Sequence, residues 1–95
     1  MAGYVIADVR VTDEAGFADF IARIPASIEA HGGKYIIRGG DVEVRQGDWA
    51  PPRFVVVEFD SIEAARAWLD SDSYAEVGEI LNRTSDTNII VIDGV

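Results

Sequence analysis

The sequence predicts a single α+β domain in which one antiparallel sheet carries two helices on one of its faces. Three observations lead to this prediction. The chain has 95 residues, which is the size of one domain, so residues 1–95 are expected to share one core. Apolar and polar residues alternate in several short segments, as they do in strands. Between these segments, apolar residues recur at helical spacing.

The first strand and the first helix are expected over residues 4–11 and 14–31. Residues 4–11 (YVIADVRV) place one fully apolar face opposite a mixed one, which is typical of a half-buried strand. Capping side chains at 12–14 precede the helical pattern. Pro25 interrupts that pattern and predicts a kink. Gly32-Gly33 is expected to end the helix, because glycine readily adopts the left-handed conformation found there.

Residues 34–45 predict one long second strand with a bulge. The segments KYIIR (34–38) and DVEVR (41–45) are both rich in strand formers, and Gly39-Gly40 separates them. A hairpin turn at the two glycines would leave two very short strands, so the bulge is favoured over the turn. Residues 46–52 (QGDWAPP) are expected to form a turn, because proline donates no ladder hydrogen bond.

The second half predicts a central strand, an interrupted helix and a terminal strand. Residues 53–60 (RFVVVEFD) are the most apolar strand, which favours a position with both faces covered. Asp60-Ser61 is expected to cap a helix that restarts at a Ser73-x-x-Glu76 capping box, and residues 87–93 close the sheet. The order βαββαβ is that of a split βαβ, or ferredoxin-like, plait with the first and third strands as central neighbours.

Charge and residue counts exclude several classes of protein. Seventeen acidic residues against eight basic ones give a net charge of −9, which would repel nucleic acid. With no cysteine there is no disulfide and no Cys-ligated zinc, and one histidine removes the usual multi-His metal sites, so no metal is expected. No cofactor is expected either. No apolar run approaches the roughly 20 residues that span a membrane. The start MAGY lacks the basic residues of a signal peptide, so the protein is expected in the cytoplasm.

The sheet face opposite the helices is predicted to meet a partner. It mixes large apolar side chains with charges, which is typical of a surface that is covered by another molecule while leaving a pocket. A second copy of the chain is the simplest partner. The residues that alternation places on this open face are Tyr4, Ile6, Asp8, Arg10, Phe54, Val56 and Glu58, with Ile36 and Arg38 expected to join them from the second strand.

His31, Asp8 and Glu58 are the candidate catalytic residues. His31, the sole imidazole, follows the first helix, where it is either a C-terminal cap or a general base at the mouth of a pocket. Asp8, Glu58 and Arg38 are expected to point into one cavity. There they form either an acid/base pair with an anchor for an anionic group, or a buried ion network.

Arg38 and four aromatic residues are the candidate ligand-binding groups. Trp49 is either a loop anchor or a pocket wall, and Tyr74 is expected at the pocket rim. Tyr4 and Phe54 belong to the open face.

Several segments resemble the uncharacterised "domain of unknown function 1330" family. They are HGGKYIIRGG (31–40), GDWAPPRFVVVEFDS (47–61), AARAWLDSDSYAEV (64–77) and a closing strand that ends in Asp93-Gly94. The resemblance covers essentially the whole chain and implies a dimeric α/β barrel, in which two ferredoxin-like protomers pack sheet to sheet. That superfamily includes cofactor-independent monooxygenases acting on quinol-like aromatics, haem enzymes and muconolactone isomerases.

Three functional hypotheses follow. The first is a homodimer that binds a small organic molecule, either between sheet and helices or inside the dimer barrel. The second is a cofactor-independent monooxygenase- or isomerase-like enzyme acting on a small aromatic or lactone. The third is a structural or regulatory dimer with no ligand. An enzyme needs a titratable group with a displaced pKa in an open cavity, a binder needs the cavity, and the third hypothesis predicts a filled barrel.

Overall fold

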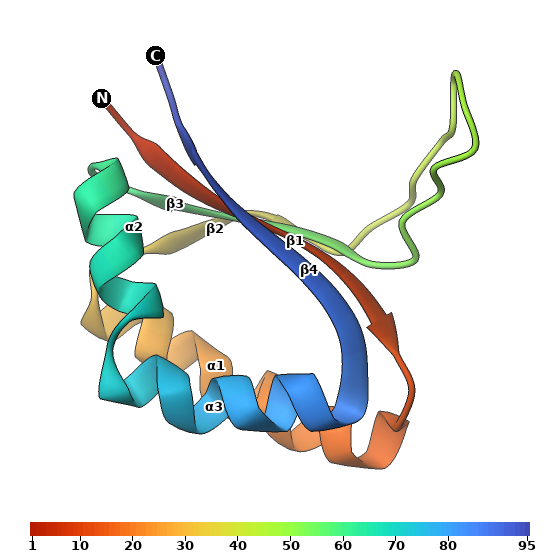
Figure 1. Cartoon of the computed structure of the whole chain (residues 1–95), viewed down its shortest axis with the longest axis horizontal. Helices are drawn as coiled ribbons and strands as arrows, with labels where there is room; N and C mark the ends of the chain where they lie inside the picture. The colour runs from red at the N-terminus through yellow and green to blue at the C-terminus, as the bar shows by residue number, and fades with distance from the viewer.

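The computed structural model describes residues 1–95 as a four-stranded antiparallel sheet with its helices on one face (Figure 1). The strand order is β2-β3-β1-β4, so the first and third strands are central neighbours, as predicted. The predicted α+β plait is therefore confirmed. In chain order the elements are β1 (Gly3–Val11), α1 (Glu14–Ala30), β2 (Lys34–Arg38), β3 (Phe54–Phe59), α2 (Ile62–Leu69), α3 (Asp72–Thr84) and β4 (Ser85–Asp93).

The core lies between the sheet and the helices. Alternation along β1 and β3 sends Val5, Val9, Val57 and Phe59 toward the helices, and all four are buried. The apolar stripe of α1 and the inward side chains of α2 and α3 complete a cluster of 13 buried residues. No helix is both long enough and apolar enough to cross a membrane.

Serine side chains fix the start of α3. The predicted capping box at Ser73 is wrong by two residues, because Ser71 is the cap and accepts a hydrogen bond from the Tyr74 amide at 3.2 Å. The Ser71 hydroxyl also donates to the carbonyl of Trp68 at 2.6 Å, which ties the end of α2 to the start of α3. Ser73 instead shares a hydrogen bond with Ser27 of α1, with 2.8 Å between their Oγ atoms.

The end of α1 explains the two consecutive glycines there. Pro25 lies inside α1 and does not end it. Gly32 has a φ of 76°, a left-handed conformation that favours glycine. At Gly33 a Cβ atom would lie 2.7 Å from the ring of Phe59, so the close approach of this turn to the core requires the missing side chain.

The second strand is shorter than predicted, and its bulge lies elsewhere. Gly39 and Gly40 have φ values of 72° and 106°, and residues 40–52 leave the sheet as an extended arm (Figure 1). The prediction of one long strand over 34–45 is therefore wrong. The register shifts between Tyr35 and Ile37 instead.

This bulge reverses the faces of the residues that follow it. Because side chains alternate along a strand, one extra residue moves the next side chains to the opposite face. Ile37 pairs with Val56 on the open face. Arg38 pairs with Val55 and lies on the helix side.

Candidate functional site

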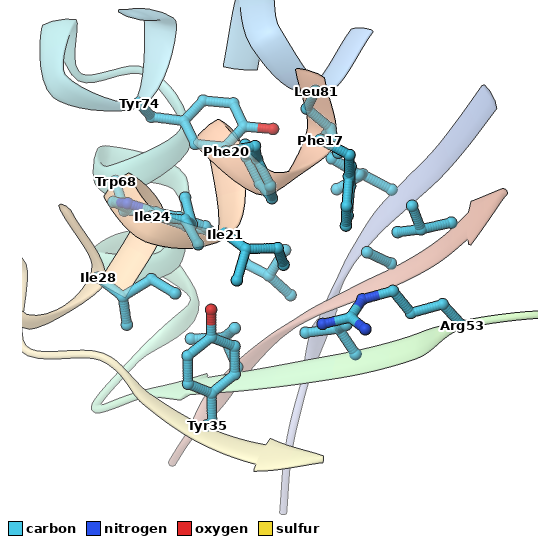
Figure 2. A pocket seen from close by; sticks show the side chains of 16 residues that line it. Phe17, Phe20, Ile21, Ile24, Ile28, Tyr35, Arg53, Trp68, Tyr74 and Leu81 are labelled. Atoms are coloured by element: carbon cyan, nitrogen blue, oxygen red, sulfur yellow. The ribbon is translucent and has the colours of Figure 1, made fainter. Parts of the chain in front are cut away.

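A cavity of about 50 Å³ lies between the sheet and the helices (Figure 2). Fifteen of its 16 lining residues are hydrophobic, and the exception is Arg53. Figure 2 shows the hydroxyls of Tyr35 and Tyr74 and the guanidinium of Arg53 directed into this space from different sides. The cavity therefore combines apolar walls with three polar groups.

Each of the three polar residues is held by a different element. Tyr35 precedes the bulge of β2 and pairs with Val57, so it faces the helices. Arg53 directly precedes β3. Because side chains alternate along a strand, Arg53 lies on the same face of the sheet as Val57, the face toward the helices. Tyr74 lies in the first turn of α3, and its ring packs edge-on against Trp68 with centroids 4.8 Å apart.

Arg53 is half-buried, whereas the other seven basic residues are exposed. The ion pairs of the chain involve other cations, and no carboxylate oxygen lies within 4.0 Å of Arg53. Its guanidinium instead lies 5.7 Å from the centre of the Phe17 ring, a weak cation–π contact. No acidic residue lines the cavity. The site therefore offers a positive charge without a protein counter-ion.

The two cavity tyrosines are hydrogen-bond donors at neutral pH. Burial raises the pKa of Tyr35 above its ordinary 10.0, and the nearby Arg38 and Arg53 oppose this effect. Burial also raises the pKa of Tyr74. Both phenols therefore stay protonated and can donate to an acceptor, and neither is poised to act as a general base near pH 7.

Alkaline pH is expected to destabilise the protein through its tyrosines. Burial raises the pKa of Tyr35 and Tyr74, and a hydrogen bond to Glu58 raises the pKa of Tyr4. The unfolded chain therefore loses these protons first, and the free energy of unfolding falls as pH rises above about 10. Urea unfolding at about pH 8 and about pH 11 measures this fall. A Tyr35→Phe/Tyr74→Phe double variant is expected to lose less stability between these two pH values than the wild type does. An equal loss would contradict the assignment of the fall to these tyrosines.

The predicted residues of the open face form two separate groups. In the first, the Tyr4 hydroxyl donates to Glu58 at 3.1 Å, and Lys34 Nζ lies 3.2 Å from the other carboxylate oxygen. In the second, Trp49 Nε1 donates to Asp8 at 2.9 Å, and the Trp49 ring packs edge-on against Phe54 with centroids 5.9 Å apart. Trp49 thus anchors the arm to the sheet.

Arg38 and His31 lie outside both groups. The prediction that Arg38 shares a cavity with Asp8 and Glu58 is wrong, because the bulge turns it to the helix side, where its guanidinium lies 4.7 Å from the Tyr35 ring centre. His31 is the C-terminal cap of α1, and its Nδ1 lies 3.0 Å from the carbonyl oxygen of Ser27. Of the predicted site residues, Tyr74 alone lines the interior cavity. No cluster of three or more acidic or histidine side chains is placed to hold a metal.

Sequence reasoning missed Arg53 and Tyr35. A signal for Arg53 was available, since it stands two residues before Val55 and four before Val57, both of which alternation assigns to the helix side. For Tyr35 no such signal existed, because its face depends on where the bulge of β2 falls.

An apolar row crosses the open face. Ile37 lies beside Val56, Val56 beside Ile6, and Ile6 beside Ile90, so each of the four strands contributes one residue. Ile37 is 42% exposed and Ile90 is 54% exposed. The two polar groups of the open face flank this apolar row along β1, one on each side.

Fold and site together define a ferredoxin-like α+β protein with an interior cavity and an uncovered sheet. The chain belongs to the family described as "Domain of unknown function (DUF1330)", which matches residues 2–95. The predicted family is thus confirmed. No curated protein matches the chain.

Solved structures share this fold at low sequence identity. A protein of unknown function from Rhodopseudomonas palustris superposes with a TM-score of 0.76 at 16% identity, covering 99% of this chain and 82% of that one. A dimeric ferredoxin-like protein of unknown function from Thermobifida fusca gives 0.68 at 19% identity, covering 99% and 92%. SnoaB, a cofactor-independent oxygenase from Streptomyces nogalater, gives 0.62 at 16% identity, also covering 99% and 92%. At these identities the similarity establishes the fold.

Proposed function

We propose that this protein binds a small, mainly apolar organic molecule in the cavity between the sheet and the helices. The observation that carries the proposal is an apolar cavity whose wall includes three polar groups, those of Arg53, Tyr35 and Tyr74. Ligand sites typically combine apolar walls with a few placed polar groups. The Arg53 guanidinium has no carboxylate partner within 4.0 Å, so its charge can pair with a ligand.

The size of the space limits the ligand to about one ring. The interior cavity of about 50 Å³ is smaller than the usual ligand pocket of roughly 300 to 1,000 Å³. An outer groove of about 390 Å³ shares three lining residues with it, namely Phe17, Ile21 and Arg53. A one-ring molecule at this junction would place its polar group beside Arg53 and its ring against the cavity wall.

Binding of one-ring probes tests this proposal. Saturation-transfer NMR with toluene, phenol and benzoate is expected to show binding by the wild type. Ala7 lines the cavity, so Ala7→Leu should fill it and reduce binding at least about tenfold. Ala22→Leu on the exposed side of α1 is the matched control and should bind as the wild type does. Circular dichroism verifies that both variants fold. Binding that Ala7→Leu leaves intact, or no binding of any probe, would contradict the proposal.

Enzymatic turnover is the second candidate function. The structural similarity to SnoaB, described as a cofactor-independent oxygenase, favours it. An acid/base step by His31, Asp8 or Glu58 would take place outside the interior cavity, because none of the three lines it. Oxygen consumption and product formation with small phenols, quinols and lactones distinguish the two functions. We expect binding without turnover, and turnover that His31→Ala abolishes would establish the enzyme instead.

We also propose that the protein is a homodimer that packs through its open faces. The apolar row exposes isoleucine side chains that a partner sheet would bury, and polar groups flank it, as they surround the centre of protein interfaces. The Thermobifida fusca protein of the same fold is described as dimeric. Light scattering at micromolar concentration is expected to give twice the chain mass of 10.3 kDa. A stable monomer would refute the dimer.

A further inference from the structure

We infer that the ligand of the interior cavity is a small aromatic anion, whose charged group is bound by Arg53 with the Tyr35 hydroxyl as a second donor. This inference rests on the proposed binding function and adds the chemical class of the ligand. It is carried by the charge of the site, by its hydrogen-bonding groups and by the rings in its wall.

The charge of the site favours an anion. Arg53 is the one charged residue that lines the cavity, and no carboxylate oxygen lies within 4.0 Å of it. Glu14 lines the outer groove with Arg53, but the two form no ion pair. A neutral oxygen can accept a hydrogen bond from the guanidinium, but a carboxylate or enolate supplies a charged acceptor, whose hydrogen bond is stronger.

The polar groups of the site can all donate a hydrogen bond. Arg53 has no acceptor, and both tyrosine hydroxyls remain protonated at neutral pH. No protein group is hydrogen-bonded to either cavity hydroxyl. A ligand oxygen with several lone pairs can accept from both Arg53 and Tyr35, whereas a cationic ligand would meet the like charge of Arg53.

The wall of the cavity favours a flat ring. Phe17 and Phe20 pack with centroids 5.4 Å apart, and Trp68 and Tyr74 pack with centroids 4.8 Å apart; all four line the cavity. Aromatic side chains bind other rings through offset or edge-on contacts. The cavity thus presents ring-binding walls next to one positive charge, which is the chemistry of an aromatic carboxylate or a phenolate-like anion.

The test compares benzoate with benzamide, two probes of nearly the same shape. Calorimetric titration of the wild type at about pH 7 is expected to show at least about tenfold tighter binding of benzoate, the gain of one charge-assisted contact. Arg53→Met should remove this preference, so that benzoate binds no more tightly than benzamide. Arg53→Lys should retain part of it. Arg38→Met, which removes the exposed arginine beside Tyr35, is the matched control and should keep the preference.

The outcomes separate the two proposals. Equal binding of benzoate and benzamide by the wild type overturns the anion inference and leaves the binding function standing. No binding of either probe, or of toluene and phenol, overturns the binding function itself. A preference that survives in Arg53→Met overturns the role of Arg53. If Arg53→Met does not fold, Tyr35→Phe replaces it. This variant should weaken benzoate binding more than benzamide binding, because it removes one donor to the charged group; equal weakening overturns the inference.

Discussion

Replacing Trp68 by alanine is expected to lower the free energy of unfolding by about 3 to 5 kcal/mol. Trp68 is 3% exposed, and its ring lies 5.4 Å from the Phe59 ring and 4.8 Å from the Tyr74 ring, between centroids. Its Nε1 donates to the buried hydroxyl of Ser27 at 3.0 Å, which joins α2 to α1. The substitution therefore leaves a large void next to the interior cavity and removes a satisfied buried hydrogen bond.

The other tryptophan of the chain, Trp49, provides a control. Trp49 is 62% exposed, and Trp49→Ala is expected to cost less than about 1 kcal/mol. Trp68→Phe should fall between the two, because it keeps most of the ring packing and loses the hydrogen bond. Urea unfolding at one fixed protein concentration gives all three values, and the fixed concentration matters because a dimer couples stability to concentration. If Trp49→Ala and Trp68→Ala lowered the free energy of unfolding by similar amounts, the burial of Trp68 would be contradicted.

Local patterns predicted most of the fold. Alternation in β1 and β3 and the capping side chain of Ser61 act within a few residues, so the sequence alone shows them. The segment DVEVR alternates equally well, yet residues 41–45 form no strand in the single chain. A strand also needs a neighbouring edge to pair with, and the positive φ of Gly39 and Gly40 directs the arm away from the sheet.

The site was harder to predict than the fold, because candidate residues are chosen by the chemistry of their side chains, and that chemistry does not show where a side chain lies. Asp8, Glu58 and His31 are acids and a base, but two of them are bonded on the open face and the third caps a helix. Tyr74 was predicted at a pocket rim and does line the cavity. The face of the sheet on which Arg38 lies depends on a single bulge, and no local pattern in KYIIR marks where that bulge occurs.

Ile90→Glu is expected to dissociate the proposed homodimer. Ile90 ends the apolar row on β4, beside Ile6 of β1. In a two-fold dimer the substitution is made twice, and each copy places an unpaired carboxylate in the interface. At about 3 to 5 kcal/mol for each stranded charge, the dissociation constant should rise at least about a thousandfold.

Sedimentation at micromolar concentration measures this loss, and the fold of the single chain is expected to survive it. Ile90 is already 54% exposed without a partner, so a glutamate there stays solvated in the monomer, and circular dichroism should show native secondary structure. Ala67→Glu, on the exposed side of α2, adds the same charge away from the open face and should remain dimeric. A dimer that persists in Ile90→Glu would show that the two copies meet through another surface, because an apolar row at the centre of the interface has no room for two unpaired carboxylates.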